Sequence, residues 1–291
     1  MASTPTLSKH RARLHFERAA PTYERAAALQ GEVAARLLQR LDLIKLRPQT
    51  ILDAGCGTAR MARSLQTRYP QARVIALDFA LGMLRQVRGR TTLWSRLAGR
   101  EPRVLRVCAD FEALPLSAGS IDMVCSNLAL EWSASPERAL RECLRVLARG
   151  GLLTFTTLGP DTLRELRAIH PEPRSGVHGF LDMHDLGDLL VSTGYADPVM
   201  DIERITLTFP DFDALVRELR ESGAAAATRA VHGLRGRAFR RRLELGYETS
   251  RRDGQLPATF EIVYGHAWKP EQGPRLTEEG HAVIRVVPRS R

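Results

Sequence analysis

The chain has 291 residues, a hydrophobic fraction of 44% and a formal net charge of +10. This length suits one large domain or two small ones with a substantial core, and we expect neither a membrane span nor a secretory signal. The charge would attract acidic partners, but the chain has no basic platform interleaved with aromatic residues and no recognisable nucleic-acid module.

The first segment is predicted to be helical. Apolar residues recur at helix spacing from Phe16 to Tyr23 and again from Val33 to Leu43, and Pro21 is expected to separate two helices. We expect residues 1–48 to form a helical cap. Tyr23 and Gln30 stand out as polar groups among apolar neighbours, although both are also compatible with partly exposed helix positions.

A buried strand running into a glycine turn follows, and it carries the sequence Asp53-Ala-Gly-Cys-Gly-Thr58. A helix pattern opens at Arg60, so the turn adjoins a helix start with unpaired N–H groups and a positive dipole end. The dinucleotide fingerprint G-x-G-x-x-G is absent. Asp53 would repel a pyrophosphate but suits a ligand with an ammonium group. An ordinary tight β–α turn is the alternative.

Two further strands are followed by an acid, because strand 73–78 ends at Asp78 and strand 104–109 precedes Asp110. Ligands of open α/β sheets bind at the carboxyl ends of the strands. Asp78 can accept both hydroxyls of a ribose, or cap the next helix. Asp110 can accept from an adenine amino group under the cover of Phe111, or be a loop acid beside a core aromatic. Met83 falls one turn into the helix that follows Asp78, near where such an adenine would lie.

The later elements complete the pattern of strands alternating with helices. Strand 120–126 leads into Asn127 and Leu128, and helix 136–147 precedes strand 152–157. We therefore predict a parallel, doubly wound sheet. The remaining predicted elements are helices 161–169, 182–192, 211–221 and 237–247 and strands 199–208 and 259–268.

This pattern predicts five parts. Residues 1–48 form the cap, 49–208 a Rossmann-like core, 209–253 a helical lid inserted between strands six and seven, 254–270 the final strand, and 271–291 a mobile tail.

The glycine turn resembles motif I of class I S-adenosylmethionine-dependent methyltransferases. This resemblance implies a Rossmann-like fold with a mostly parallel seven-stranded sheet whose last strand is antiparallel. Ala59 stands where members usually have a third glycine, and alanine can replace it if φ is negative. The residues then expected to bind S-adenosylmethionine, or its product S-adenosylhomocysteine, are Gln30, Asp53, Gly55, Cys56, Gly57, Thr58, Asp78, Met83, Asp110, Phe111, Asn127 and Leu128.

Segments outside the core resemble the malonyl-acyl-carrier-protein O-methyltransferases of biotin synthesis, the BioC family. The resemblance runs from about residue 13 to 270. One departure is Glu131, where the family more often has glutamine; it adds a negative charge near an anionic substrate. Another is Gly223-Ala224-Ala225, where relatives tend to have Gly-Ala-Asn. The matching segments are Phe16 to Gln30, Ser126 to Trp132, Leu158 to Leu166, Phe180 to Asp185 and Gly254 to Phe260.

The resemblance implies methyl transfer to the free carboxylate of malonyl-acyl-carrier protein, for pimeloyl and biotin synthesis. A carboxylate is ionised at neutral pH, so no general base is required. The first candidate for positioning the substrate is Tyr23. Arg164 and Arg220 are candidates for carboxylate or phosphopantetheine contacts, although each is also explained as a solvated helix arginine.

The partner implied is an acidic carrier protein, or malonyl-coenzyme A, and the basic stretches Arg96–Arg106 and Arg237–Arg242 would suit the carrier. An arginine-rich composition from a GC-rich genome also explains the charge. The four cysteines are widely spaced without a Cys-x-x-Cys pair, which indicates a cytoplasmic protein with reduced cysteines and no metal site.

Three alternatives remain open. One is another small-molecule or quinone-type methyltransferase on the same fold, and the second is an assembly factor that keeps the cofactor pocket without methyl transfer. The third is nucleic-acid methylation, but Asn-Leu-Ala-Leu after strand four does not look like the Pro-Pro-Tyr type of motif used on amino groups.

Overall fold

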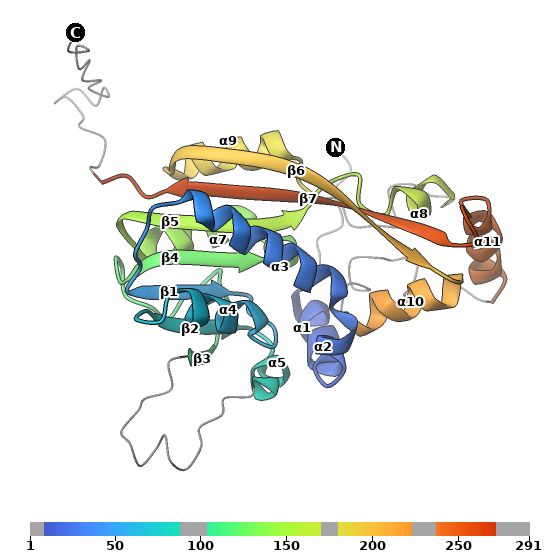
Figure 1. Ribbon diagram of the computed structural model, residues 1–291, viewed down its shortest axis with the longest axis horizontal. Coiled ribbons are helices and arrows are strands. Elements are labelled where there is room, and N and C mark those ends of the chain that lie inside the picture. The colour runs from blue at the N-terminus through green and yellow to red at the C-terminus, as the bar shows by residue number, and fades with distance from the viewer. Residues whose placement is uncertain (1–8, 88–103, 170–179, 223–236, 272–291) are drawn as a thin grey trace, which may run out of the picture.

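Seven strands form one sheet in the part of the chain that the structure, a computed structural model, describes: residues 9–87, 104–169, 180–222 and 237–271 (Figure 1). The strand order is β3-β2-β1-β4-β5-β7-β6. The strands are β1 (Thr50–Ala54), β2 (Arg73–Asp78), β3 (Val104–Cys108), β4 (Ile121–Asn127), β5 (Leu147–Leu158), β6 (Ala196–Phe209) and β7 (Leu256–Trp268).

The first five strands run parallel, and β7 is antiparallel to both β5 and β6. This confirms the predicted mostly parallel sheet with an antiparallel last strand. The chain moves outward from β1 to β3 and then returns to β4 on the other side of β1. The switch between β1 and β4 is where an open α/β sheet leaves a crevice at its carboxyl edge.

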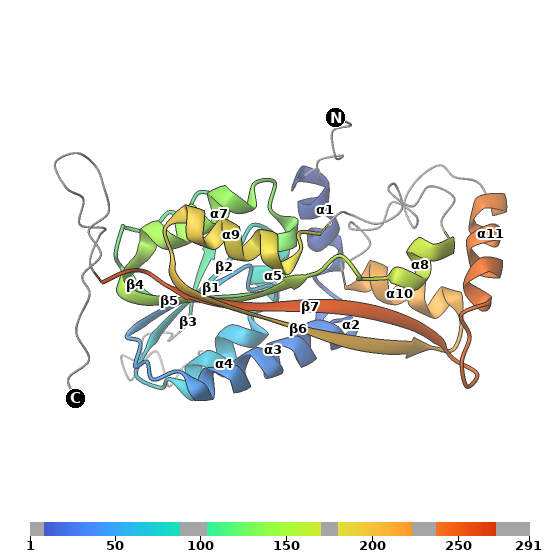
Figure 2. The same ribbon diagram turned by 90° about the horizontal axis from the view of Figure 1, so that it is seen from above.

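Helices cover both faces of the sheet (Figure 2). On one face α3 and α4 enclose a core that includes Val33, Leu37 and Leu65; on the other, α7 and α9 enclose a core that includes Leu140 and Leu186. The described helices are α1 (Lys9–Ala19), α2 (Tyr23–Ala26), α3 (Ala28–Arg40), η1 (Leu41–Leu43), α4 (Arg60–Arg68), α5 (Leu81–Gln86), η2 (Leu130–Trp132), α7 (Pro136–Val146), α8 (Arg164–Ile169), α9 (Met183–Thr193), α10 (Phe212–Glu221) and α11 (Arg237–Glu248).

The predicted N-terminal cap divides into two parts with different positions. Helices α1 and α2 lie at the carboxyl edge of the sheet, whereas α3 packs on its face against α4, β4 and β5 (Figure 1). The apolar stripe that begins at Val33 belongs to this second part, because Val33 and Leu37 are fully buried in the core. Helices α1 and α2, together with the start of α3 that carries Gln30, are therefore placed to contact a ligand at this edge.

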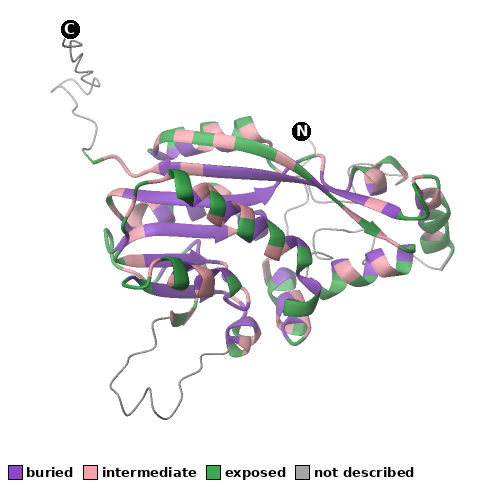
Figure 3. Ribbon diagram, in the orientation of Figure 1, coloured by how far each residue is buried: buried purple, intermediate pink, exposed green. Residues whose placement is uncertain are grey.

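The last two strands are longer than their sequence pattern predicts. They pair from Ala196 opposite Trp268 to Phe209 opposite Leu256 and extend beyond the rest of the sheet. The outer strand β6 consists mainly of exposed and half-buried residues, while the central strand β4 is buried except at two half-buried positions (Figure 3). Helices α10 and α11 lie between β6 and β7, in the segment predicted to be a lid, and α10 contacts α2.

The glycine turn holds a left-handed alanine. The φ of Ala59 is 59°, so the negative φ on which we based the replacement of glycine by alanine is wrong. Ala59 immediately precedes α4 and is fully buried, so the surrounding packing holds it in this conformation at a cost of about 1–2 kcal/mol in backbone strain.

Three predicted features lie wholly or largely outside the described residues: the basic stretch Arg96–Arg106, Gly223-Ala224-Ala225 and the tail 271–291. Within the described residues, no helix is both long and apolar enough to cross a membrane.

Candidate active site

Two adjoining compartments lie at the carboxyl ends of β1, β2 and β4. Tyr23, Gly55 and Asn127 line both. The first, called here the aromatic compartment, is lined by Lys9, Phe16, Tyr23, Gly55, Gly57, Leu77, Asp78, Phe79, Met83, Ala109, Asp110, Phe111, Asn127, Leu128, Ala129 and Trp132. The second, the carboxylate compartment, is lined by Tyr23, Glu24, Ala27, Gln30, Gly31, Ala34, Asp53, Gly55, Cys56, Thr58, Arg60, Met61 and Asn127. Every residue predicted to bind the cofactor lines one or both.

The glycine turn brings bare backbone close to both compartments. Gly55 and Gly57 have φ values of 77° and 53°. A Cβ added at Gly55 would lie 2.3 Å from the Ala129 Cβ, and one at Gly57 would lie 3.3 Å from the Tyr23 ring. Both the backbone conformation and the close approach therefore require glycine here.

Two buried oxygen acceptors in the carboxylate compartment lack partners within the described structure. They are the Asp53 Oδ2 and the Gln30 Oε1. Asp53 is 1% exposed, and burial raises the pKa of its carboxyl to about 7, although the Ala62 N–H opposes that rise. Buried acceptors without donors are costly. The arrangement fits a ligand with several N–H donors and a positive charge.

Asp78 fastens the glycine turn to the end of β2. Its Oδ2 accepts a hydrogen bond of 2.8 Å from the Gly57 N–H, and its Oδ1 accepts one of 2.8 Å from the Ala80 N–H. Burial raises the pKa of this carboxyl to about 6, while these two N–H groups lower it. The Ala80 N–H precedes α5, so Asp78 does not cap that helix as the alternative from sequence required, and its side chain lines the aromatic compartment.

The turn after β4 is held in a strained conformation. Leu128 has a φ of 48°, which is unfavourable for leucine. Its N–H donates to the Thr156 carbonyl and hydroxyl oxygens at 3.1 and 3.0 Å. Asn127 accepts from the Thr156 hydroxyl at 3.0 Å and donates to the Gln30 carbonyl at 3.1 Å. The Asn127 side chain thus links this turn to the start of α3.

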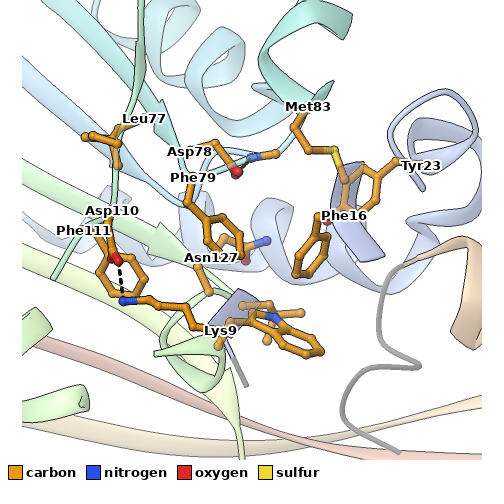
Figure 4. A pocket seen from close by; sticks show the side chains of 16 residues that line it. Lys9, Phe16, Tyr23, Leu77, Asp78, Phe79, Met83, Asp110, Phe111 and Asn127 are labelled. Carbon is orange, nitrogen blue, oxygen red and sulfur yellow. Dashed lines mark hydrogen bonds and ion pairs between the residues drawn. The ribbon is translucent and has the colours of Figure 1, made fainter. Parts of the chain in front are cut away.

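An aromatic cluster covers the other side of the aromatic compartment (Figure 4). The Phe16 ring lies 5.1 Å from Trp132 in a T-shaped contact and 6.0 Å from Phe79. None of these three aromatic residues was predicted from the sequence to line the site. Sequence features could have identified the three aromatic residues: Phe16 and Trp132 lie in segments that resemble the family, and Phe79 directly follows Asp78. For Lys9 the sequence offers no indication beyond the basic character of the first residues.

The three candidates for substrate contacts are not gathered together. Tyr23 lies between the compartments, and burial together with Asp78 and Glu131 raises the pKa of its hydroxyl, which stays protonated. Arg164 lines a separate groove near the far end of β6 and β7. Arg220 is exposed on the last turn of α10. Neither arginine lines either compartment.

Glu131 is buried, with 9% of its surface exposed. The Thr157 hydroxyl donates to its Oε2 at 3.1 Å. Burial raises the pKa of the Glu131 carboxyl to about 8, even though this bond and a backbone N–H lower it. The negative charge expected from the sequence is therefore mostly absent at pH 7.

We expect Glu131→Gln to stabilise the protein increasingly as the pH rises from about 5 to 8. The folded protein retains a proton that the unfolded chain releases near pH 4.5, so wild-type stability falls across this window. The gain in unfolding free energy should be about 1 kcal/mol per pH unit, measured by denaturant unfolding. Glu137→Gln, on the exposed face of α7, is the control. A pH-independent difference for Glu131→Gln would contradict this account.

The comparisons with known proteins agree with this fold. Residues 52–155 match a family model described as a methyltransferase domain. The YcgJ protein of Bacillus subtilis has a TM-score of 0.53 at 15% identity, covering 81% of this chain and 98% of that one. Phosphoethanolamine N-methyltransferase 2 of Haemonchus contortus, solved with phosphomonomethylethanolamine and S-adenosylhomocysteine, has a TM-score of 0.50 at 17% identity, covering 81% and 52%. At these identities, the structures establish the fold alone.

Curated relatives with much higher sequence identity establish the family as well as the fold. The malonyl-[acyl-carrier protein] O-methyltransferase of Methylovorus sp. (strain MP688) is 48% identical over 98% of this chain and 96% of the relative. That of Gallionella capsiferriformans is 49% identical over 96% and 97%. With about half of all residues identical along nearly the full length, the chain belongs to the malonyl-[acyl-carrier protein] O-methyltransferase family and is an S-adenosylmethionine-dependent enzyme.

Proposed function

We propose that this chain methylates the free carboxylate of a malonyl group carried as a thioester on acyl carrier protein, with S-adenosylmethionine as methyl donor. The malonyl methyl ester would serve the pimeloyl and biotin route of this family. The observation that carries the proposal is the pair of unpartnered buried acceptors on Asp53 and Gln30 beside an aromatic compartment.

The described residues fit the cofactor. Asp53 and Gln30 would hold its ammonium group, Asp78 its ribose hydroxyls, and Asp110 its adenine amino group, with Met83 and the other aromatic-compartment residues around the ring. When bound, the cofactor supplies a methyl group activated on a sulfonium. The glycine turn and the post-β4 turn would approach it through their backbone.

The residues of the site would promote the reaction by positioning the substrate and excluding water, more than by acid–base catalysis. The nucleophile is a carboxylate that is already ionised, and no histidine lines either compartment as described. Burial raises the pKa of the Cys56 thiol well above its usual value, so it is not a nucleophile. Because the reaction neutralises opposite charges, a desolvated site favours it.

Tyr23 and Glu131 suit a site for an anion in different ways. Tyr23 keeps its proton, so its hydroxyl can donate a hydrogen bond to the malonyl carboxylate and orient it. Glu131 is mostly neutral at pH 7, so it does not repel that carboxylate. An acid at this position is therefore compatible with the substrate.

Two arginines are assigned to different parts of the carrier-bound substrate. Arg220 makes no hydrogen bond or ion pair with a described residue, and its helix α10 contacts α2, which carries Tyr23. We assign it to the malonyl carboxylate. Arg164 lies in the outer groove with Arg252 and several hydroxyl side chains, where it would contact phosphopantetheine or the carrier.

The carrier itself would dock on the exposed arginines of α11. Arg241 and Arg242 are both exposed, and acidic helices would complement them. The four cysteines are free thiols, which supports a cytoplasmic location, because thiols stay reduced in that compartment.

Incubation with methyl-labelled S-adenosylmethionine and malonyl-acyl-carrier protein tests the function directly. We expect base-labile label on the malonyl group, since a methyl ester is formed. A parallel reaction with malonyl-coenzyme A shows whether the carrier is required. Label in RNA, or no transfer to either malonyl thioester, would contradict the proposal and favour one of the alternative functions.

We expect Arg220→Gln to raise KM for malonyl-acyl-carrier protein roughly tenfold to a hundredfold, because it removes a charge-assisted hydrogen bond of about 1.5–3 kcal/mol. KM for S-adenosylmethionine should not change. Arg217→Gln is the matched control, since Arg217 is also exposed on α10 and makes no hydrogen bond or ion pair with a described residue. Equal effects of the two substitutions would remove Arg220 from the site.

A further inference from the structure

Lys9, the first residue of α1, bridges two carboxylates at the edge of the aromatic compartment. Its Nζ lies 2.5 Å from the Asp110 Oδ2 and 2.6 Å from the Glu112 Oε1 (Figure 4 shows the contact with Asp110). The Lys9 side chain is 24% exposed and lines the compartment. Its ammonium is therefore partly withdrawn from water and held by two charges.

The two carboxylates are fixed by other contacts. Asp110 accepts a hydrogen bond of 2.9 Å from the Glu112 N–H through its Oδ1, so its Oδ2 remains for a ligand or for Lys9. Glu112 is buried, and its Oε1 accepts from the Ser133 hydroxyl at 2.6 Å and from the Ala134 N–H at 2.7 Å. Lys9 therefore attaches α1 to a rigid part of the core.

The opposite end of α1 is attached to a different wall of the compartment. Glu17 accepts a hydrogen bond of 2.7 Å from the Gly82 N–H of α5. Between the two ends, Phe16 packs against Trp132 and Phe79. Helix α1 is thus a roof held at both ends, and Lys9 is its cationic attachment.

This attachment uses the oxygen that the proposed ligand needs. Asp110 and Phe111 lie where the adenine is assigned, and Lys9 holds the outward Asp110 oxygen. An adenine amino group that approaches this oxygen from within the compartment would compete with the ammonium for it. Lys9 need not leave the site, because Glu112 offers a second acceptor at 2.6 Å.

We propose that Lys9 is a latch that fastens α1 over the adenine end of the cofactor site, pairing with Asp110 and Glu112 in the empty site and with Glu112 alone when adenine occupies Asp110. This inference rests on the proposed cofactor site but not on the malonyl substrate. In both states the latch limits opening of the roof, so it slows entry and exit of the ligand. Its loss should therefore change rates more than affinity.

S-adenosylhomocysteine binding by stopped-flow tryptophan fluorescence tests the latch, since Trp132 lines the compartment. We expect Lys9→Gln to raise both the association and the dissociation rate constants about tenfold, as for the loss of one charge-assisted hydrogen bond, with Kd changed less than about threefold. Lys9→Arg keeps the cation and should restore most of the wild-type rates.

Arg13→Gln is the matched control. Arg13 is exposed on the same helix, makes no hydrogen bond or ion pair with a described residue, and loses the same charge. Rates for Lys9→Gln equal to those of Arg13→Gln would overturn the latch. A change in the dissociation rate alone would overturn it too, because that indicates an ordinary ligand contact. Wild-type protein that binds no S-adenosylhomocysteine would refute the cofactor site itself, and the latch with it.

Discussion

The burial of Asp53 at the end of β1 is the constraint on which the site depends. This carboxyl is 1% exposed, one of its oxygens has no partner within the described structure, and burial holds its pKa at about 7. Such a group is unfavourable in an empty protein and favourable once a cation reaches it. The switch between β1 and β4 supplies the opening, and the glycine turn gives a ligand access to the backbone beside it.

The surrounding residues maintain an environment in which opposite charges can meet and be neutralised. The aromatic cluster around Phe16 excludes water from one side. Tyr23 remains protonated, and Glu131 is mostly neutral at pH 7, so neither opposes an incoming carboxylate. Neither arginine candidate lines the two compartments: Arg220 is exposed on α10, which contacts α2, and Arg164 lies in an outer groove. The proposed arginine contacts to the substrate are thus separated in space from the proposed site of methyl transfer.

The sheet, and the side of the site that the sheet forms, could be predicted from the sequence because short local patterns mark where each strand ends. Asp53, Asp78 and Asp110 each follow an apolar run, and a parallel sheet brings such ends to one edge. What could not be predicted depends on contacts between distant segments. The attachment of Lys9 to Asp110, the neutral state of Glu131 and the remote position of Arg164 are set by tertiary packing. The left-handed Ala59 shows that the surrounding fold can impose a backbone conformation that residue type disfavours.

The most direct measurement of the central claim is a double-mutant cycle between Asp53→Asn and removal of the ligand's amino group. Affinities of S-adenosylhomocysteine and its deaminated analogue would be measured by calorimetry at pH 8, where Asp53 is mostly ionised. Removing the amino group should weaken binding to the wild type about a hundredfold and binding to Asp53→Asn by only a few fold. Equal losses in both proteins would show that Asp53 does not hold the ammonium group.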